Sequence, residues 1–176
     1  MNSFKDFINE KDKLLGKLKP YEKLLYGAYI EFLKDYYKVN KDITLSIRKP
    51  TGKAMFGFID LMALREGKYK VIIQGGYGAL EHIGHEFTHI AQYDRGDFDC
   101  TDDYKMLIWK NKEYMSIKEY SSIQGKDFEK YKKIPWEAEA YKQQEILPDL
   151  FKKSKFLEEL KGKDVNLDFL IDNDAL

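Results

Sequence analysis

Residues 85–89 read His-Glu-Phe-Thr-His (HEFTH) and match the short pattern HExxH. An α-helix turns by about 100° per residue, so residues four apart share one face, and the imidazole rings of His85 and His89 can reach a single point. A zinc ion prefers four ligands, with nitrogen at about 2.0 Å, so this pair supplies half of a zinc site. Glu86 lies on the same side, where its carboxylate can take a proton from a metal-activated water molecule.

The sequence around HEFTH favours an amphipathic helix that follows a β-strand. We expect the helix to run from about Ala79 to Tyr93. The preceding segment Tyr69–Ile73 (YKVII) reads as a strand, and the glycines at 75, 76 and 78 indicate a turn between the two elements. His82 lies one turn ahead of His85, where it either steers a substrate or is an incidental helix histidine. The apolar positions that we expect to be buried are Leu80, Ile83, Phe87, Ile90 and Ala91.

A third protein ligand must come from elsewhere in the chain. None of the three histidines follows HEFTH, so a site with a third histidine downstream is excluded. The remaining ligand is then a carboxylate, and the best-placed segment is a helix that Pro135 is expected to open. This helix carries Glu137 and Glu139, which are about 200° apart around its axis, so only one of them can face the metal.

The segments HEFTHIAQY (85–93), IWKNKEY (108–114) and IPWEAEAY (134–141) together resemble gluzincin-type zinc metallopeptidases, in which a glutamate on a second helix completes the site. Thermolysin-like and ImmA/IrrE-type peptidases share this arrangement, and small uncharacterised metallopeptidase-like proteins of phages and prophages look similar. The resemblance covers about Tyr69 to Pro148. It implies a zincin-like fold and hydrolysis of peptide bonds through a metal-activated water, with Zn2+ as cofactor and a protein or peptide as substrate.

The same resemblance selects Glu137 as the third ligand. The family motif is a glutamate followed three places later by a small residue, and Glu137 with Ala140 matches it. The chain departs from ImmA/IrrE-type sequences at Tyr141, which stands where an Asn or Asp is usual. The site that the resemblance implies has these members: metal ligands His85, His89 and Glu137, and catalytic Glu86.

Hydrolysis of an amide also needs a donor that stabilises the oxyanion, a role that tyrosine and histidine commonly serve. Spacing leaves this residue open, because several tyrosines are eligible: Tyr93, Tyr104, Tyr114, Tyr131 and Tyr141. We also expect carboxylates that orient the two metal-binding histidines from behind. The candidates for this second role are Asp60, Asp94 and Glu139.

We expect helices at the N-terminal end of the chain and a small sheet after them. Asn2 or Ser3 can cap a first helix that extends to Leu18, and Pro20 opens a second helix that extends to Tyr36. Three apolar runs read as strands of a small antiparallel or mixed sheet: Ile43–Ile47, Met55–Ala63 and Tyr69–Ile73.

Beyond HEFTH we expect a solvated loop, a hairpin and further helices. The loop is the acidic stretch 93–103, and the hairpin spans 106–117 with Asn111 in a left-handed turn conformation. The glutamate-bearing helix should end or kink at Pro148. Another helix, with apolar residues between 150 and 160, should cover the core.

Composition sets the remaining bounds. The chain has 176 residues, 43% of them apolar, which favours one domain with a substantial core. Lysine plus arginine equals aspartate plus glutamate at 30 each, so no net charge would recruit nucleic acid or an anionic membrane. No run approaches the about 20 apolar residues that span a bilayer. The start, MNSFKDFINEKDKLL, lacks a secretory signal, so we expect a cytoplasmic protein.

We therefore predict an α+β fold in a single zincin-like domain over 1–176. Its parts are N-terminal helices in 1–40, a catalytic core in 41–147 and a C-terminal helical tail in 148–176. In the core, the small sheet packs against the HEFTH helix and against the second, glutamate-bearing helix.

Three interpretations of function follow from these patterns. The first is a zinc metallopeptidase in which an extended peptide pairs with strand Tyr69–Ile73 as a sheet edge. The alternative is a non-catalytic zincin-fold protein of a phage or mobile element that binds zinc or a partner without turnover. The last is a helical scaffold in which HEFTH arises by chance, and it predicts that no metal binds.

Overall fold

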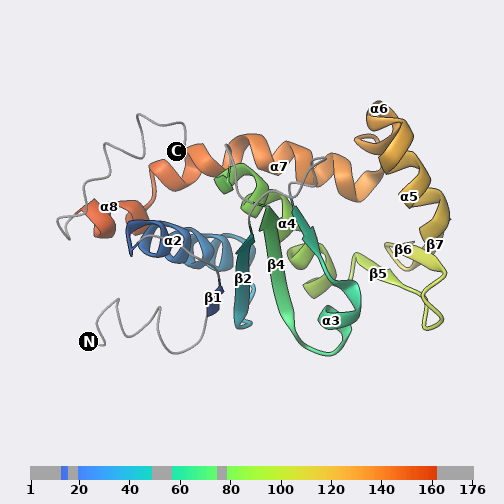
Figure 1. The fold of residues 1–176 in the computed structure, drawn as a ribbon, viewed down its shortest axis with the longest axis horizontal. Coiled ribbons are helices and arrows are strands. Elements are labelled where there is room, and N and C mark those ends of the chain that lie inside the picture. The colour runs from blue at the N-terminus through green and yellow to red at the C-terminus, as the bar shows by residue number, and fades with distance from the viewer. Residues whose placement is uncertain (1–12, 16–19, 49–56, 75–78, 162–176) are drawn as a thin grey trace.

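The computed structural model describes residues 13–15, 20–48, 57–74 and 79–161 of the chain. Within these ranges helices and strands are mixed, as the α+β prediction requires (Figure 1). Most of the expected first helix lies outside the described residues, and so do the glycine turn at 75–78 and the last part of the C-terminal tail.

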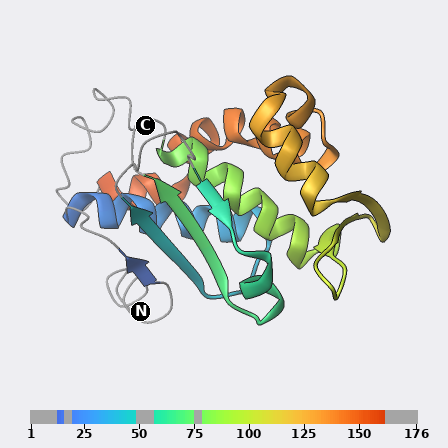
Figure 2. The same cartoon turned by 45° about the vertical axis from the view of Figure 1, so that its right-hand side comes forward.

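A four-stranded sheet in the order β1-β2-β4-β3 lies on one side of the main helices (Figure 2). The strands β1 (Lys13–Leu15), β2 (Ile43–Arg48) and β4 (Tyr69–Gln74) are parallel, and β3 (Gly57–Ile59) runs antiparallel to β4. The sheet is therefore mixed. Its alternating residues Leu45, Val71 and Ile73 are fully buried, so one face of the sheet forms part of the main core.

Two expectations about this sheet are wrong. The apolar spacing of residues 13–15 predicts a helix, but these residues pair as a strand with residues 44–46, because the backbone of β2 offers hydrogen-bond partners that a local pattern does not reveal. The segment Tyr69–Ile73 is not an edge, since β4 lies between β2 and β3. Among the described residues the edge strands are β1 and β3, and the apolar run that contains β3 continues into the short helix α3 (Leu61–Arg65).

Helices pack on the sheet and on one another around one large apolar core. The helix α4 (Ala79–Asp94) packs against β3, β4 and α7 (Pro135–Lys152), while α2 (Pro20–Tyr37) packs against α4 and α8 (Lys155–Lys161) (Figure 1). The predicted bounds of α4 are confirmed to within one residue, and all of its predicted interior residues are buried. All five residues of the HEFTH segment are therefore buried.

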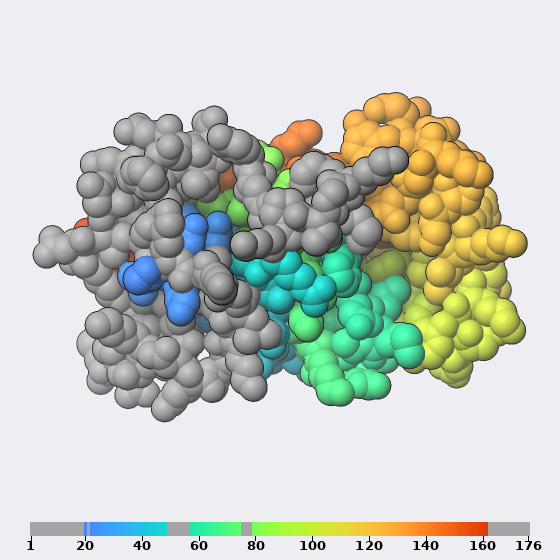
Figure 3. Space-filling model, in the orientation of Figure 1, coloured from blue at the N-terminus to red at the C-terminus, as the bar shows by residue number. Residues whose placement is uncertain are grey.

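A second, smaller core lies between a three-stranded antiparallel sheet and two short helices. The sheet has the order β5 (Phe98–Cys100), β6 (Met106–Trp109) and β7 (Lys112–Ser116), and the helices are α5 (Ile117–Lys126) and α6 (Phe128–Tyr131). The predicted hairpin is confirmed, with Asn111 at φ 64° in its turn. Figure 3 shows this part of the chain as the yellow and orange end of the molecule.

The sequence patterns did not reveal β5, α5 or α6. The acidic stretch 93–103 is not a solvated loop throughout, because Phe98 and Cys100 are buried in the second core while the aspartates between and beside them face outward. The helices α5 and α6 lie in a polar stretch with few apolar residues. They begin at side-chain caps, since Ser116 and Asp127 each accept a hydrogen bond from a backbone N–H three residues on.

The helix α7 connects the two cores. Its first turn places Trp136 in the second core, and its last turns place Leu147 and Phe151 in the first. The expectation that the helix ends or kinks at Pro148 is wrong in one respect, because the helix continues to Lys152. Burial of Leu147, Pro148 and Phe151 along one side offsets the backbone hydrogen bond that the proline cannot donate.

We predict opposite effects of alanine at two helical glycines. A Cβ at Gly84 would lie 2.7 Å from the Tyr29 hydroxyl and 3.1 Å from a Leu147 methyl group, so Gly84→Ala should push α4 away from its neighbours and cost about 1–3 kcal/mol. A Cβ at Gly125 meets nothing within 4 Å, so Gly125→Ala should stabilise α5 by about 0.5–1 kcal/mol. Urea unfolding measures the free energy of unfolding of both variants. Equal changes in this free energy would contradict the packing described above.

Candidate metal centre

His85 and His89 direct their Nε2 atoms toward each other from successive turns of α4. The two Nε2 atoms are 3.3 Å apart. Both side chains are buried, because they lie on the side of α4 that faces the interior of the fold. The spacing of four residues therefore does what the sequence predicts, since side chains at i and i+4 lie one above the other on a helix.

Glu137, in the first turn of α7, completes a cluster of three possible ligands. Its carboxylate oxygens lie 3.3 Å from Nε2 of His85 and 3.5 Å from Nε2 of His89, and its side chain is fully buried. One ligand atom from each residue lies within 4.8 Å of the other two, which is close enough to hold a metal ion. Glu139 faces elsewhere and accepts hydrogen bonds from Arg95. Of the two glutamates left open by the helix geometry, the structure brings Glu137 to the histidines.

Glutamine side chains hold the outer nitrogen of each ring. Nδ1 of His85 is 3.0 Å from Oε1 of Gln144, and Nδ1 of His89 is 2.8 Å from Oε1 of Gln92. Because an amide oxygen only accepts, each Nδ1 carries a proton, so in the neutral form of either ring the lone pair is on Nε2. Both Nε2 atoms face the carboxylate of Glu137, and a cation bound between them in place of a proton would satisfy all three groups.

The carboxylates expected to orient the histidines have other partners. Asp60 caps α3 by accepting from the N–H of Ala63, and Asp94 accepts from the Tyr69 hydroxyl at 3.1 Å. Glu139 reaches a histidine only through Gln92, which donates to it at 3.2 Å. The sequence did carry a signal for Gln92, because a residue three places after His89 lies on the same helix face.

Charge coupling within the cluster is strong because all three groups are buried. Burial by itself lowers the pKa of His89, but the carboxylate of Glu137 outweighs burial and raises this pKa to about 9. Burial raises the pKa of Glu137, while the two histidines bring it well below its ordinary value. Oε2 of Glu137 nevertheless has no hydrogen bond among the described residues, although Nε2 of His85 lies 3.3 Å from it. This buried acceptor is the atom that a metal ion would satisfy most directly.

Glu86 lies beside the cluster and directly under β3. Its side chain is buried, and this burial raises the pKa of its carboxyl group even though the two histidines oppose the shift. A Cβ at Gly57 would lie 2.7 Å from Cγ and 2.8 Å from Oε1 of Glu86. The strand β3 can therefore approach the carboxylate only because residue 57 has no side chain.

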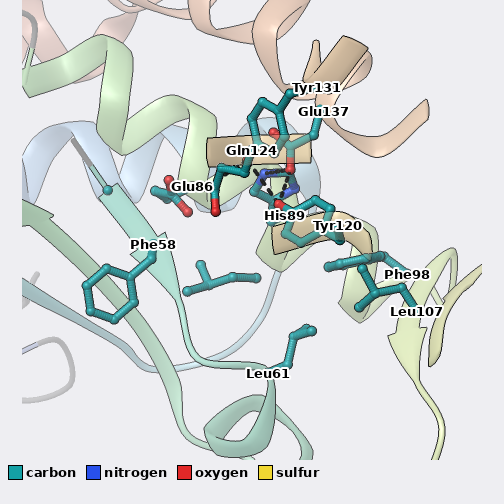
Figure 4. A pocket seen from close by; sticks show the side chains of 12 residues that line it. Phe58, Leu61, Glu86, His89, Phe98, Leu107, Tyr120, Gln124, Tyr131 and Glu137 are labelled. Carbon is teal, nitrogen blue, oxygen red and sulfur yellow. Dashed lines mark hydrogen bonds and ion pairs between the residues drawn. The ribbon is translucent and has the colours of Figure 1, made fainter. Parts of the chain in front are cut away.

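Two hollows meet at Glu86. The smaller, of about 170 Å³, reaches His89 and Glu137, and the larger, of about 530 Å³, reaches His85. Figure 4 shows Glu86, Gln124 and Tyr131 among the side chains that line the smaller hollow, with Glu86 next to the strand that carries Phe58. These three residues line both hollows, so a molecule in either one would contact the carboxyl group.

Two tyrosines from the second core adjoin the cluster. Tyr120 donates to Oε1 of Glu137 at 2.7 Å, and its hydroxyl oxygen is 2.9 Å from that of Tyr131 (Figure 4). Burial, followed by the charge of Glu137, raises the pKa of both phenols well above the ordinary value, so both stay protonated. Sequence reasoning named Tyr131 but missed Tyr120, because nothing in its stretch predicted the helix α5 that positions it.

The other tyrosines that the sequence left open are distributed over the fold. Tyr141 lines the larger hollow, and the centroid of its ring is 4.6 Å from that of His85. Tyr93, Tyr104 and Tyr114 instead contact Tyr69, Arg65 and Trp136. The structure therefore brings Tyr131 and Tyr141, but not the other three, to the hollows beside the cluster.

His82 lines the larger hollow one turn before His85, and it is not part of the three-residue cluster. Burial and the nearby His85 lower its pKa, so its ring is neutral at neutral pH. A neutral imidazole at this position could contact a molecule in the hollow, as the sequence interpretation allows.

Comparison with known protein families, with curated proteins and with solved structures finds no match to this chain. Among the described residues, no helix has the length and apolar character needed to cross a membrane.

We predict that the protein loses stability as pH rises when metal is removed with a chelator. The folded-state pKa of His89 is raised from 6.5 to about 9, so its ion pair with Glu137 stabilises the fold fully below pH 6.5 and is lost as pH rises through about 9. The pKa of Glu137 is lowered from 4.5, so its contribution is present above pH 4.5 and is lost as pH falls. Urea unfolding at pH 5.5, 7.5 and 9.5 should show the decline.

The matched variant Glu137→Gln removes the charge that raises the pKa of His89. Its stability should therefore change less than that of the wild type between pH 6.5 and 9. An equal decline in both proteins would show that other groups cause the pH dependence.

Proposed function

We propose that this chain is a zinc-dependent metallopeptidase of the gluzincin type that its sequence resembles, with a zincin-like fold. One observation carries the proposal: two imidazole Nε2 atoms and a carboxylate converge in a buried cluster, with the carboxyl group of Glu86 beside them at the edge of a hollow. A chance HEFTH motif in a scaffold helix would not bring a buried glutamate from residue 137 to both rings.

The donor set suits zinc. Two nitrogen ligands and one carboxylate oxygen leave a fourth position, which is the usual composition of a catalytic rather than a structural zinc site. Zinc bound there supplies Lewis acidity, which polarises a carbonyl group and lowers the pKa of water. The smaller hollow borders both His89 and Glu137, so a substrate group can approach the cluster from that side.

Glu86 is the residue that we assign to proton transfer. It does not belong to the three-ligand cluster, yet it lies on the same helix and lines the same hollow. Because burial raises the pKa of its carboxyl group, Glu86 is better matched to accepting and returning a proton near neutral pH than an exposed glutamate would be. We assign Tyr131, which lines both hollows, as a donor to the carbonyl oxygen of the substrate.

A peptide is the substrate class that the position of β3 favours. Its residues Gly57, Phe58 and Ile59 line the smaller hollow, and within the described part of the chain β3 is the edge strand that packs beside α4. An extended chain that paired with this edge would place its backbone in front of Glu86. The edge strand, rather than β4, therefore takes the peptide-binding role proposed from the sequence.

We predict that Glu86→Gln abolishes cleavage but keeps the metal. Removing a general base should lower kcat at least about 100-fold, because the amide cannot accept the proton. The zinc-loaded wild type and variant can be incubated with a complex library of protein-derived peptides and the products identified by mass spectrometry. Zinc content, measured by atomic absorption, should stay near one equivalent in both proteins, because Glu86 is not a ligand.

The matched control is Glu81→Gln, which removes an exposed carboxylate from the same helix and should leave cleavage unchanged. His85→Ala should lose zinc. If the wild type binds one equivalent of zinc but cleaves no more peptides than Glu86→Gln, the peptidase proposal fails and a non-catalytic zinc-binding protein takes its place.

We also predict that Gly57→Ala lowers kcat while zinc content is unchanged. The added methyl group would collide with Cγ and Oε1 of Glu86, so the carboxylate must move away from its position beside the cluster. A displacement of this kind should cost about 10- to 100-fold in kcat. Steady-state kinetics on a peptide from the library screen would test this, and a wild-type kcat would show that β3 does not fix the position of Glu86.

A further inference from the structure

The two histidines of the cluster have the same kind of partner in different surroundings. Each Nδ1 faces the side-chain oxygen of a glutamine, Gln144 for His85 and Gln92 for His89. Gln144 is half-buried and lines the larger hollow, whereas Gln92 is completely buried between α4 and α7. Among the described residues, further groups hold the amide of Gln92 in place but not that of Gln144.

The orientation of the Gln92 amide is determined by its neighbours. Its nitrogen donates to the backbone oxygen of Trp136 at 2.9 Å and to Oε2 of Glu139 at 3.2 Å. Both of these groups only accept hydrogen bonds, so the amide cannot turn over without placing its own oxygen against two other acceptors. The oxygen of Gln92 is thereby held against Nδ1 of His89.

Glu139 is itself held at the surface. Arg95 is the residue that follows α4. It donates to both carboxylate oxygens of Glu139 at 2.8 Å and 2.7 Å, and its Nε donates to Asp97 at 2.6 Å. The Arg95 and Glu139 side chains are partly exposed, at 39% and 29%. A continuous chain of hydrogen bonds therefore runs from the protein surface through Glu139 and Gln92 to His89.

We propose that Gln92 is a positioning residue that keeps the proton of His89 on Nδ1 and leaves Nε2 free to bind a metal, and that Glu139 and Arg95 act through Gln92. This assigns different tasks to the two acids of the PWEAEAY segment. Glu137 faces the cluster, and Glu139, on the opposite side of the helix turn, fixes the partner of a cluster residue. The inference rests on metal binding at the cluster and not on hydrolysis.

The first test measures zinc affinity by competition with a chromophoric chelator. Gln92→Met, which has a similar volume but cannot accept a hydrogen bond, should weaken zinc binding about 10- to 100-fold, as is usual when the outer partner of a ligand is lost. Glu139→Ala should weaken binding by a smaller factor of the same sign. Glu145→Ala removes an exposed glutamate from the same helix and should change nothing.

The double variant decides whether Glu139 acts through Gln92. If it does, adding Glu139→Ala to Gln92→Met should have no further effect on zinc affinity, since the intermediary is already gone. If Glu139 merely attracts the cation by its charge, its removal should weaken binding by the same factor in both backgrounds. That additive result would overturn the proposal for Glu139.

A spectroscopic signature tests Gln92 directly. In 15N-labelled protein the Nδ1 proton of His89 should be protected from exchange and visible in NMR spectra, with or without zinc, because Nδ1 donates to Gln92 in both states. Gln92→Met should remove this signal and leave that of His85, whose partner is Gln144. If the Nδ1 proton signals of both histidines disappear equally in Gln92→Met, the variant is generally unfolded and the assignment is overturned. If the variant keeps the wild-type signal of His89, the assignment is likewise overturned.

The metal centre and the positioning chain can fail separately. A wild-type protein that binds no zinc would end the metal-centre proposal, while the protected Nδ1 proton of His89 in the same metal-free protein would still decide the role of Gln92. Should Gln92→Met fail to fold, the partly exposed pair supplies the test: Arg95→Ala and Glu139→Ala should each raise the exchange rate of that proton. If the exchange rate of this proton is unchanged in both variants, the proposal is overturned.

Discussion

The packing of α4 against α7 is the interaction on which the candidate site depends. In the sequence, the three-stranded sheet and the helices α5 and α6 lie between these two helices, yet their contact brings a glutamate side chain within 3.5 Å of both histidines. The contact is apolar where Leu147 approaches Gly84 and polar where Gln92 bonds to Trp136. The absence of a side chain at Gly84 allows the close approach, and the buried hydrogen bond sets the register between the helices.

Burying two imidazoles and a carboxylate is costly unless the groups satisfy one another. Here each ring has an acceptor behind it, and Tyr120 donates to one oxygen of Glu137, while the other oxygen has no hydrogen bond among the described residues. This partial satisfaction separates the cluster from an ordinary buried ion pair. A cation-binding function explains why the polar groups are retained in an interior that apolar residues could fill, and metal binding would then contribute to the stability of the fold.

Local patterns predicted the parts of the fold that local physics controls. The spacing of apolar residues placed α4 to within one residue, and the position of Asn111 predicted the hairpin turn. The errors concern distant partners: residues 13–15 become a strand only because β2 offers an edge, and β4 is central only because β3 folds back against it. In the site, motif spacing pointed to Glu137. Gln144 and Tyr120 were missed because their contacts depend on how distant helices pack, whereas Gln92 could have been found from its spacing to His89.

The shared helix α7 has a consequence for how the molecule comes apart. One end of α7 buries Trp136 in the smaller core, and the other end buries Phe151 in the larger core. Local unfolding of either core therefore disturbs the helix that both cores share. Glu137, the candidate third ligand, lies in the first turn of α7, next to Trp136. A metal ion bound at the site would therefore stabilise both cores. We expect it to slow local unfolding in both cores together rather than in the nearer core alone.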